Sequence, residues 1–160
     1  MDPTILLLGK KVLIVDDEAD ILDTMEEVLY MCEVDVAQDF ESAKKMLGEN
    51  NYDVAVLDIM GVNGYELLKI ANNKSILSVI LTAHALSPDN FQKSMKLGAR
   101  AYIPKQKMIE LDVILSDVFN DEDQKPGTMG KWYDRLKGYF EKKFGRADWA
   151  EKDTTGNDDL

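Results

Sequence analysis

The chain has 160 residues, of which 45% are apolar, and it carries a formal net charge of −11. This size and apolar content predict one domain of ordinary size with a hydrophobic core and a short appendage. The negative charge argues against a nucleic-acid-binding protein, because Lys and Arg contacts to phosphate supply most of that affinity.

The chain begins with an apolar run at residues 5–8 that is too short for a signal peptide or a membrane span. A strand is predicted at residues 12–15, and an amphipathic helix follows, with apolar residues at helical spacing from Ile21 to Cys32. Cys32 is the only cysteine and ends this apolar stripe, so we expect a core residue rather than a nucleophile. A single cysteine cannot form an internal disulfide, which predicts a reducing cytoplasm.

Strands and helices alternate through the next part of the chain. The predicted strands are 34–37, 54–58, 76–82 and 101–105, and the predicted helices are 40–47 with Asp39 as N-cap, a short helix around 65–70, one that starts at Ser87-Pro88, and 107–119. Five strands that alternate with helices predict a doubly wound α/β fold. We expect a flavodoxin-like parallel sheet of order 2-1-3-4-5 with helices on both faces.

Functional groups in such a sheet gather at the carboxyl ends of the strands. The groups found there are Asp16 and Asp17, Asp58, Thr82 and Lys105. Carboxylates this close together need a cation, or they raise one another's pKa. Hard oxygen ligands of this kind suit Mg²⁺ or Mn²⁺.

The chemistry of these groups favours phosphoryl transfer. A metal held by Asp17, Asp58 and a backbone carbonyl would leave positions open for phosphoryl oxygens. The Asp58 carboxylate could then attack phosphorus, while Lys105 and the Thr82 hydroxyl bind the phosphoryl oxygens. Two rival functions stay open. One is a metal-dependent phosphatase or phosphotransferase with Asp58 as nucleophile, although Met60 stands where such enzymes carry a second acid; the other is a constitutive scaffold without turnover.

Four segments carry a family resemblance. They are Val12-Leu13-Ile14-Val15-Asp16-Asp17-Glu18, Val54-Ala55-Val56-Leu57-Asp58-Ile59-Met60, Ile80-Leu81-Thr82-Ala83 and Gly98-Ala99-Arg100-Ala101-Tyr102-Ile103-Pro104-Lys105. In this order and spacing, residues 9–120 resemble the receiver domain of two-component response regulators. The resemblance implies that Asp58 accepts a phosphoryl group from a histidine kinase or a phosphotransfer protein. It also implies a metal site made by Asp17, Asp58, the Met60 carbonyl and, through a water, Asp16.

The same resemblance assigns further roles near the phosphoacceptor. Thr82 and Tyr102 occupy the switch positions, and Lys105 occupies the position of the phosphoryl-binding lysine. Met60 and His84 each follow a site residue by two positions, where family members tune the hydrolysis of the acyl phosphate. On the residues alone, an exposed loop residue is the favoured interpretation of His84, whereas Tyr102 is equally a half-buried aromatic at the sheet edge.

The sequence departs from the family pattern at two places. The turn after Asp58 is about two residues short, and Val62 stands where proline is common. Gln106 follows Lys105 in place of the usual proline of a cis peptide, and a cis bond without proline costs about 3 kcal/mol, so the geometry of this bond is left open.

The helix at 107–119 has more apolar residues than one core-facing stripe needs. We expect some of them to face a downstream protein, through a surface within residues 87–119, or a second copy of the chain. The segment 121–130 has linker composition, residues 131–146 form a basic, aromatic amphipathic helix, and 147–160 read as a polar tail. Three interpretations of the helix stay open: docking on its own receiver or a partner, peripheral contact with an anionic membrane, and a little-structured tail.

No output domain is predicted in the forty residues after the receiver. We therefore expect a stand-alone receiver that is not an enzyme beyond its own phosphorylation and dephosphorylation, and whose output is a protein contact.

Overall fold

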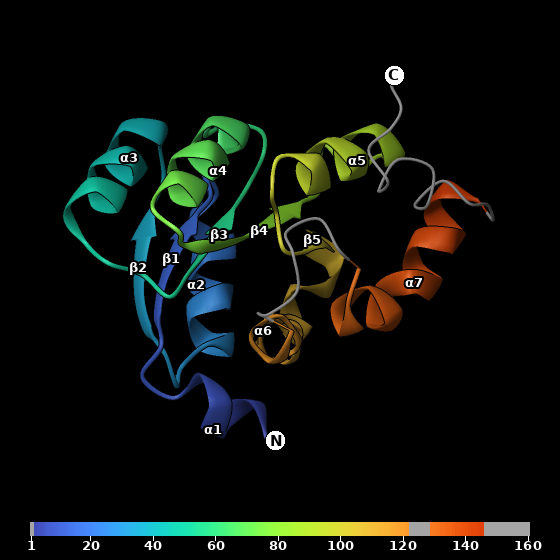
Figure 1. The fold of residues 1–160 in the computed structure, drawn as a ribbon, viewed down its shortest axis with the longest axis horizontal. Coiled ribbons are helices and arrows are strands. Elements are labelled where there is room, and N and C mark those ends of the chain that lie inside the picture. The colour runs from blue at the N-terminus through green and yellow to red at the C-terminus, as the bar shows by residue number, and fades with distance from the viewer. Residues whose placement is uncertain (1, 122–128, 146–160) are drawn as a thin grey trace.

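The computed structural model describes residues 2–121 and 129–145, which contain a five-stranded parallel sheet of order β2-β1-β3-β4-β5 (Figure 1). The strands are β1 Lys11–Val15, β2 Glu33–Ala37, β3 Val54–Leu57, β4 Leu77–Thr82 and β5 Tyr102–Pro104. The helices between them are α2 Ala19–Val28, α3 Phe40–Glu49, α4 Gly64–Asn73 and α5 Pro88–Lys96. The predicted flavodoxin-like order is confirmed, with α2 and α6 (Leu111–Asn120) on one face and the other helices between strands on the opposite face.

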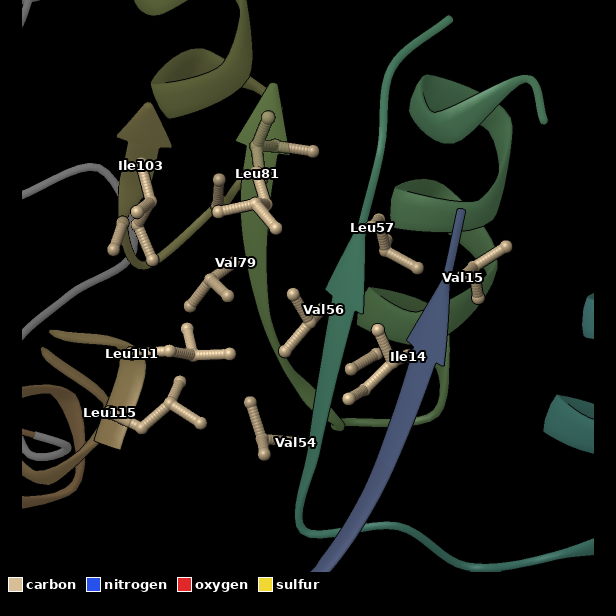
Figure 2. Packing of buried hydrophobic residues seen from close by; sticks show 14 of the residues in the cluster. Ile14, Val15, Val54, Val56, Leu57, Val79, Leu81, Ile103, Leu111 and Leu115 are labelled. Carbon is tan, nitrogen blue, oxygen red and sulfur yellow. The ribbon is translucent and has the colours of Figure 1, made fainter. Parts of the chain in front are cut away.

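The central strand β3 explains why the sheet forms here. All four of its residues are buried, as expected for a parallel strand covered by helices on both faces. Figure 2 shows Val54 and Val56 on the side of the sheet where Leu111 and Leu115 of α6 lie. Side chains alternate along a strand, so Leu57 points to the other face. Each apolar residue of β3 thus has a helix to pack against, and the strand ends where the first charged residue follows.

The helix starts are set by local capping. The Asp39 side chain accepts a hydrogen bond from the Ser42 N–H at the start of α3, as predicted. Ser87 does the same for the Asn90 N–H at the start of α5, with Pro88 in the first turn. These caps satisfy backbone donors that have no partner inside the helix.

Three elements differ from the prediction. A short helix α1, Pro3–Leu7, precedes the sheet and contacts α6; it was not predicted. The predicted helix at 107–119 is wrong in its first part, because Lys105–Glu110 form a 3₁₀ helix, η1, and α6 begins only at Leu111. The strand before it is also shorter than predicted, ending at Pro104. Proline cannot donate to a ladder, which limits how far β5 pairs.

The basic, aromatic helix forms α7, Lys131–Phe144, and packs against α6 at the side of the molecule opposite β2 (Figure 1). Of the apolar residues of α6, Leu111, Ile114, Leu115 and Val118 are buried. Within the same chain α6 also contacts α1 and α7, and the surface expected to face a partner or a second copy stays a prediction. Most of the predicted linker, residue 146 and the predicted tail 147–160 lie outside the described residues. None of the helices in the described ranges has the length and apolar character needed to cross a membrane.

Candidate functional site

The register of the sheet brings the first acidic residues together. Val15 of β1 lies beside Leu57 of β3, so the residues that follow each strand become neighbours. The Asp58 N–H donates to the Val15 carbonyl at 3.0 Å, which fixes the backbone of Asp58 against the end of β1. Asp16, Asp17 and Asp58 each place one carboxylate oxygen within 4.8 Å of the others. The predicted acidic cluster therefore forms at the carboxyl ends of β1 and β3.

Lys105 enters this cluster from β5. Thr82 pairs with Pro104 across the β4–β5 ladder, so the next residue of the chain reaches over the sheet edge toward β1 and β3. The Lys105 Nζ lies 2.7 Å from Asp16 Oδ2, 3.2 Å from Asp58 Oδ2 and 3.1 Å from Glu18 Oε1. One ammonium group thus balances part of the charge of several carboxylates.

Glu18 was not among the predicted site residues. Its signal in the sequence was its place as the third acid after β1, and its side chain, half exposed, reaches Lys105 from the outer side of the cluster.

The Lys105-Gln106 peptide is trans, since the described residues contain no cis peptide bond.

Burial makes the charges of the cluster costly. Desolvation, followed by the charge of Asp16, raises the pKa of Asp58 to about 6 against the attraction of Lys105. Desolvation likewise raises the pKa of Asp16, although the hydrogen bond from Lys105 opposes it. Burial acts to lower the pKa of Lys105, but the hydrogen bond with Asp16 and the charge of Asp58 outweigh it and raise that pKa. The site holds more negative charge than one lysine neutralises, which favours a bound cation.

The short turn after Asp58 depends on two glycines. Gly61 has a φ of +85°, and a Cβ there would lie 2.3 Å from Asp17 Oδ2. Gly64 passes even closer to the backbone of Asp58, where a Cβ would lie 1.9 Å from its carbonyl oxygen. The shortened turn therefore lies directly against the acidic cluster. The Met60 side chain, in contrast, is 52% exposed, so only its backbone is a candidate for the metal site.

The remaining predicted residues lie on both sides of the loop after β4. Thr82 is fully buried at the end of β4, and its Oγ1 accepts a hydrogen bond from the Ala85 N–H at 3.2 Å. Tyr102 is also fully buried, so the alternative of a half-buried edge residue is wrong. Its hydroxyl donates to the Ala85 carbonyl at 2.8 Å and accepts from the Ser87 N–H at 3.2 Å. His84 is exposed, as its loop interpretation expected.

The donor set fits a hard divalent cation. The cluster offers only carboxylate oxygens, which are the ligands that Mg²⁺ takes, and the exposed Asp17 opens it to solvent. Burial raises the pKa of Asp58, and a bound cation would oppose that shift, because an opposite charge nearby favours the carboxylate. Mg²⁺, with Mn²⁺ as a substitute, is therefore compatible with the residues present.

Fold and site together define a flavodoxin-like α/β protein with an acidic pocket and a lysine at the carboxyl edge of its sheet. The chain belongs to the response regulator receiver domain family, whose sequence profile matches residues 12–118. The matched range includes Asp16, Asp17, Asp58, Thr82 and Lys105. The family expected from the sequence motifs is thus confirmed.

Individual relatives agree with this family. The chain is 33% identical to the two-component response regulator ARR18 of Arabidopsis thaliana over 104 residues, which are 61% of this chain and 16% of that protein. It is 32% identical to the transcriptional regulatory protein MalR of Bacillus subtilis over 103 residues, or 59% of this chain and 43% of that one. The chain thus spans less than half the length of these relatives.

Among solved structures, the receiver domain of the Francisella response regulator 1452 is similar, with a TM-score of 0.63 and 28% identity. The superposition covers 71% of this chain and 99% of that one. The likeness therefore extends over a whole receiver domain and leaves over a quarter of this chain without a counterpart.

Proposed function

We propose that the chain is a phosphorylation-switched response regulator in which Asp58 accepts a phosphoryl group from a histidine kinase or a phosphotransfer protein. The observation that carries the proposal is the buried Asp58 carboxylate, 3.2 Å from Lys105 and grouped with Asp16 and Asp17. A nucleophile, a cation for the transferred group and a pocket for a metal are thereby in one place.

In the proposed reaction an Asp58 oxygen attacks the phosphorus of a phosphohistidine. The new O–P bond forms as the N–P bond to the imidazole breaks, and the imidazole leaves with the bonding electron pair. Asp17, Asp58 and the Met60 carbonyl would hold the Mg²⁺ directly, and Asp16 would bind it through a water. When bound, the metal supplies neutralisation of the phosphoryl and carboxylate charge.

The chain's own side chains then hold the acyl phosphate. Lys105 already contacts Asp58 and pairs with a phosphoryl oxygen once the aspartyl phosphate has formed. The Thr82 hydroxyl, whose oxygen accepts from Ala85, keeps its proton free to donate to the phosphoryl group. Met60 and the exposed His84 stand at the two positions proposed to set the rate of hydrolysis.

We propose a protein–protein contact as the output, in the cytoplasm, with no enzymatic product other than the turnover of the acyl phosphate. The units of the chain in this proposal are the receiver at 9–120, the linker at 121–130, the helix at 131–146 and the tail at 147–160. The stand-alone arrangement stays a prediction from the sequence.

Incubation with Mg²⁺ and acetyl phosphate, followed by intact mass measurement, tests the proposal. We expect an added mass of about 80 Da, one phosphoryl group, that is lost at alkaline pH as an acyl phosphate should be. Chelation of Mg²⁺ should abolish it.

Asp58→Asn is the matched control, since it keeps the shape of the side chain and removes the nucleophile. A protein that gains no labile, Asp58-dependent mass would contradict the proposal and leave the scaffold interpretation. The same adduct on Asp58→Asn would assign the phosphoryl group to another residue. A His84→Ala variant that loses its phosphoryl group at the unaltered rate would remove His84 from the rate-tuning positions.

A further inference from the structure

The helix α7 covers one face of the receiver, formed by α5, β5 and α6. Its buried residues Trp132, Leu136 and Phe140 are spaced at i, i+4 and i+8, and none is more than 1% exposed. The ring of Phe140 lies 5.3 Å from that of Phe91 on α5 and 6.2 Å from that of Tyr102 on β5. This spacing and packing are those of an amphipathic helix seated in an apolar surface. We call this covered surface the α5–β5–α6 face.

Polar contacts fix the position of α7 on this face. Arg135 Nε and Nη2 donate to the two carboxylate oxygens of Asp117 on α6, at 2.8 and 3.1 Å. The Asp117 side chain is only 7% exposed, and a buried carboxylate is stable as an ion only when it is paired. The Tyr139 hydroxyl donates to Gln106 Oε1 at 2.7 Å. An arginine therefore lies among the buried apolar residues of α7 and pairs with the buried carboxylate of the face. This complementarity identifies α7 as a segment that fits the face.

Two series of contacts connect α7 with the acidic site. In the first, Lys105 contacts Asp58, and the next residue, Gln106, accepts from Tyr139 of α7.

In the second, Thr82 accepts from the Ala85 N–H, and the Ala85 carbonyl accepts from the Tyr102 hydroxyl. The ring of Tyr102 then lies beside Phe140. Each series of contacts therefore ends at a residue that α7 touches, Gln106 in the first and Tyr102 in the second.

We propose that α7 is a detachable occupant of the α5–β5–α6 face and that phosphorylation of Asp58 releases it, freeing that face for a partner. The proposal rests on the proposed function of Asp58. A phosphoryl group draws Lys105 away from Asp16 and Glu18, and it draws Thr82 and the loop bonded to Tyr102 toward the site.

The α5–β5–α6 face fits α7 in the conformation without phosphate. The affinity of the face for α7 therefore falls when that conformation changes. An occupant that binds one state better shifts the population toward that state, and the shift is reciprocal. Release of α7 and retention of phosphate should therefore favour each other.

The fluorescence of Trp132 reports the docking of α7. The chain has two tryptophans, so a Trp149→Phe background leaves Trp132 as the only one. Acrylamide is a suitable quencher because it carries no charge and is not repelled by the acidic protein. We expect quenching of Trp132 to rise several-fold when Mg²⁺ and acetyl phosphate are added, and to stay low in the Asp58→Asn variant.

Intact mass measured on the same samples separates the outcomes. An adduct on Asp58 with unchanged quenching would overturn the release of α7 and leave the proposed function intact. Absence of the adduct would overturn both. Quenching that falls as the protein concentration rises would assign the docked helix to a second copy and overturn the intramolecular contact.

Reciprocity gives an independent measurement. Arg135→Ala weakens the docking of α7 without touching the acidic site, so a larger fraction of the protein should carry phosphate at the same acetyl phosphate concentration. Lys137→Ala is the matched control, because Lys137 is an exposed basic residue of the same helix. Equal phosphorylation of both variants would overturn the linkage.

Discussion

The acidic site and the α7 interface meet at β5, but they are opposite in character. Lys105, just after β5, contacts the carboxylates of Asp16, Glu18 and Asp58, and Asp17 adds a further negative charge, so the site is left with excess negative charge. At the α7 interface, aromatic rings pack together and the buried carboxylate of Asp117 is held by two hydrogen bonds. The charge of the acidic site therefore suits a bound cation, whereas the α7 interface has its buried charge paired within the chain.

The largest effect is expected at Lys105. Lys105→Met leaves buried carboxylates without their counter-charge, and breaking such a pair costs about 3–5 kcal/mol in the free energy of unfolding at pH 7. At pH 5 the loss should shrink, because Asp58 without Lys105 has a still higher pKa and becomes protonated. Urea unfolding at the two pH values, with a chelator present, measures both.

Lys107→Met is the control for this substitution. Lys107 pairs with Glu110 one turn away at a partly exposed position, where a salt bridge is worth about 0–1 kcal/mol. Equal losses for the two variants would mean that the acidic site is solvated rather than buried.

The second prediction compares Phe91 with Phe140, which contact each other and are both fully buried. Phe91→Ala on α5 should cost about 3–5 kcal/mol, as for a Phe in a protein core. Phe140→Ala should cost less, because its loss cannot exceed the free energy that docks α7 on the receiver. Urea unfolding followed by far-UV circular dichroism measures both, and equal costs would make α7 an integral part of the core.

The contrast between the two regions also marks what the sequence could predict. Asp58 and the strand before it follow from a local apolar run, and the cluster follows from the rule that strand ends meet at one edge. Glu18 was passed over because its role depends on the reach of Lys105 across the sheet. The docking of α7 stayed one of three interpretations, since an apolar stripe shows that a helix is covered but not by what.

Shorter elements were missed for a different reason. The helix α1 has only five residues, too few for a periodic pattern, although Asp2 and Pro3 form the N-cap and first position of a helix. The complete burial of the Tyr102 side chain depends on aromatic rings that other elements, α5 and α7, pack against it. Local patterns therefore predicted the acidic site, and tertiary contacts decided the α7 interface.

The third prediction concerns pH. Unfolded Asp58 loses its proton near pH 3.8, whereas the folded protein retains it until the pKa of about 6. The folded state therefore binds more protons in this interval, and stability falls as the pH rises through it, by at most about 3 kcal/mol. Asp58→Asn should flatten this part of the curve and stabilise the protein at pH 7.

Mg²⁺ sharpens the same measurement. Because the metal binds the carboxylate form, added Mg²⁺ should stabilise the unaltered protein more at pH 7.5 than at pH 5. The Asp58→Asn variant should show a weaker gain. A gain that does not depend on pH would place the metal away from Asp58.

The smallest effect is expected at the one polar contact that links α7 to the residue after Lys105. Tyr139→Phe removes the hydroxyl that donates to Gln106, at an exposed position where a hydrogen bond contributes about 0.5 kcal/mol. The free energy of global unfolding should hardly change, but acrylamide quenching of Trp132 should increase slightly in the protein without phosphate. Tyr30→Phe, at a 73% exposed side chain just after α2, is the control and should leave quenching unchanged. If the two variants behave alike, the path from Asp58 to α7 runs through Tyr102 and Phe140 alone, because the contact through Gln106 then carries no docking energy.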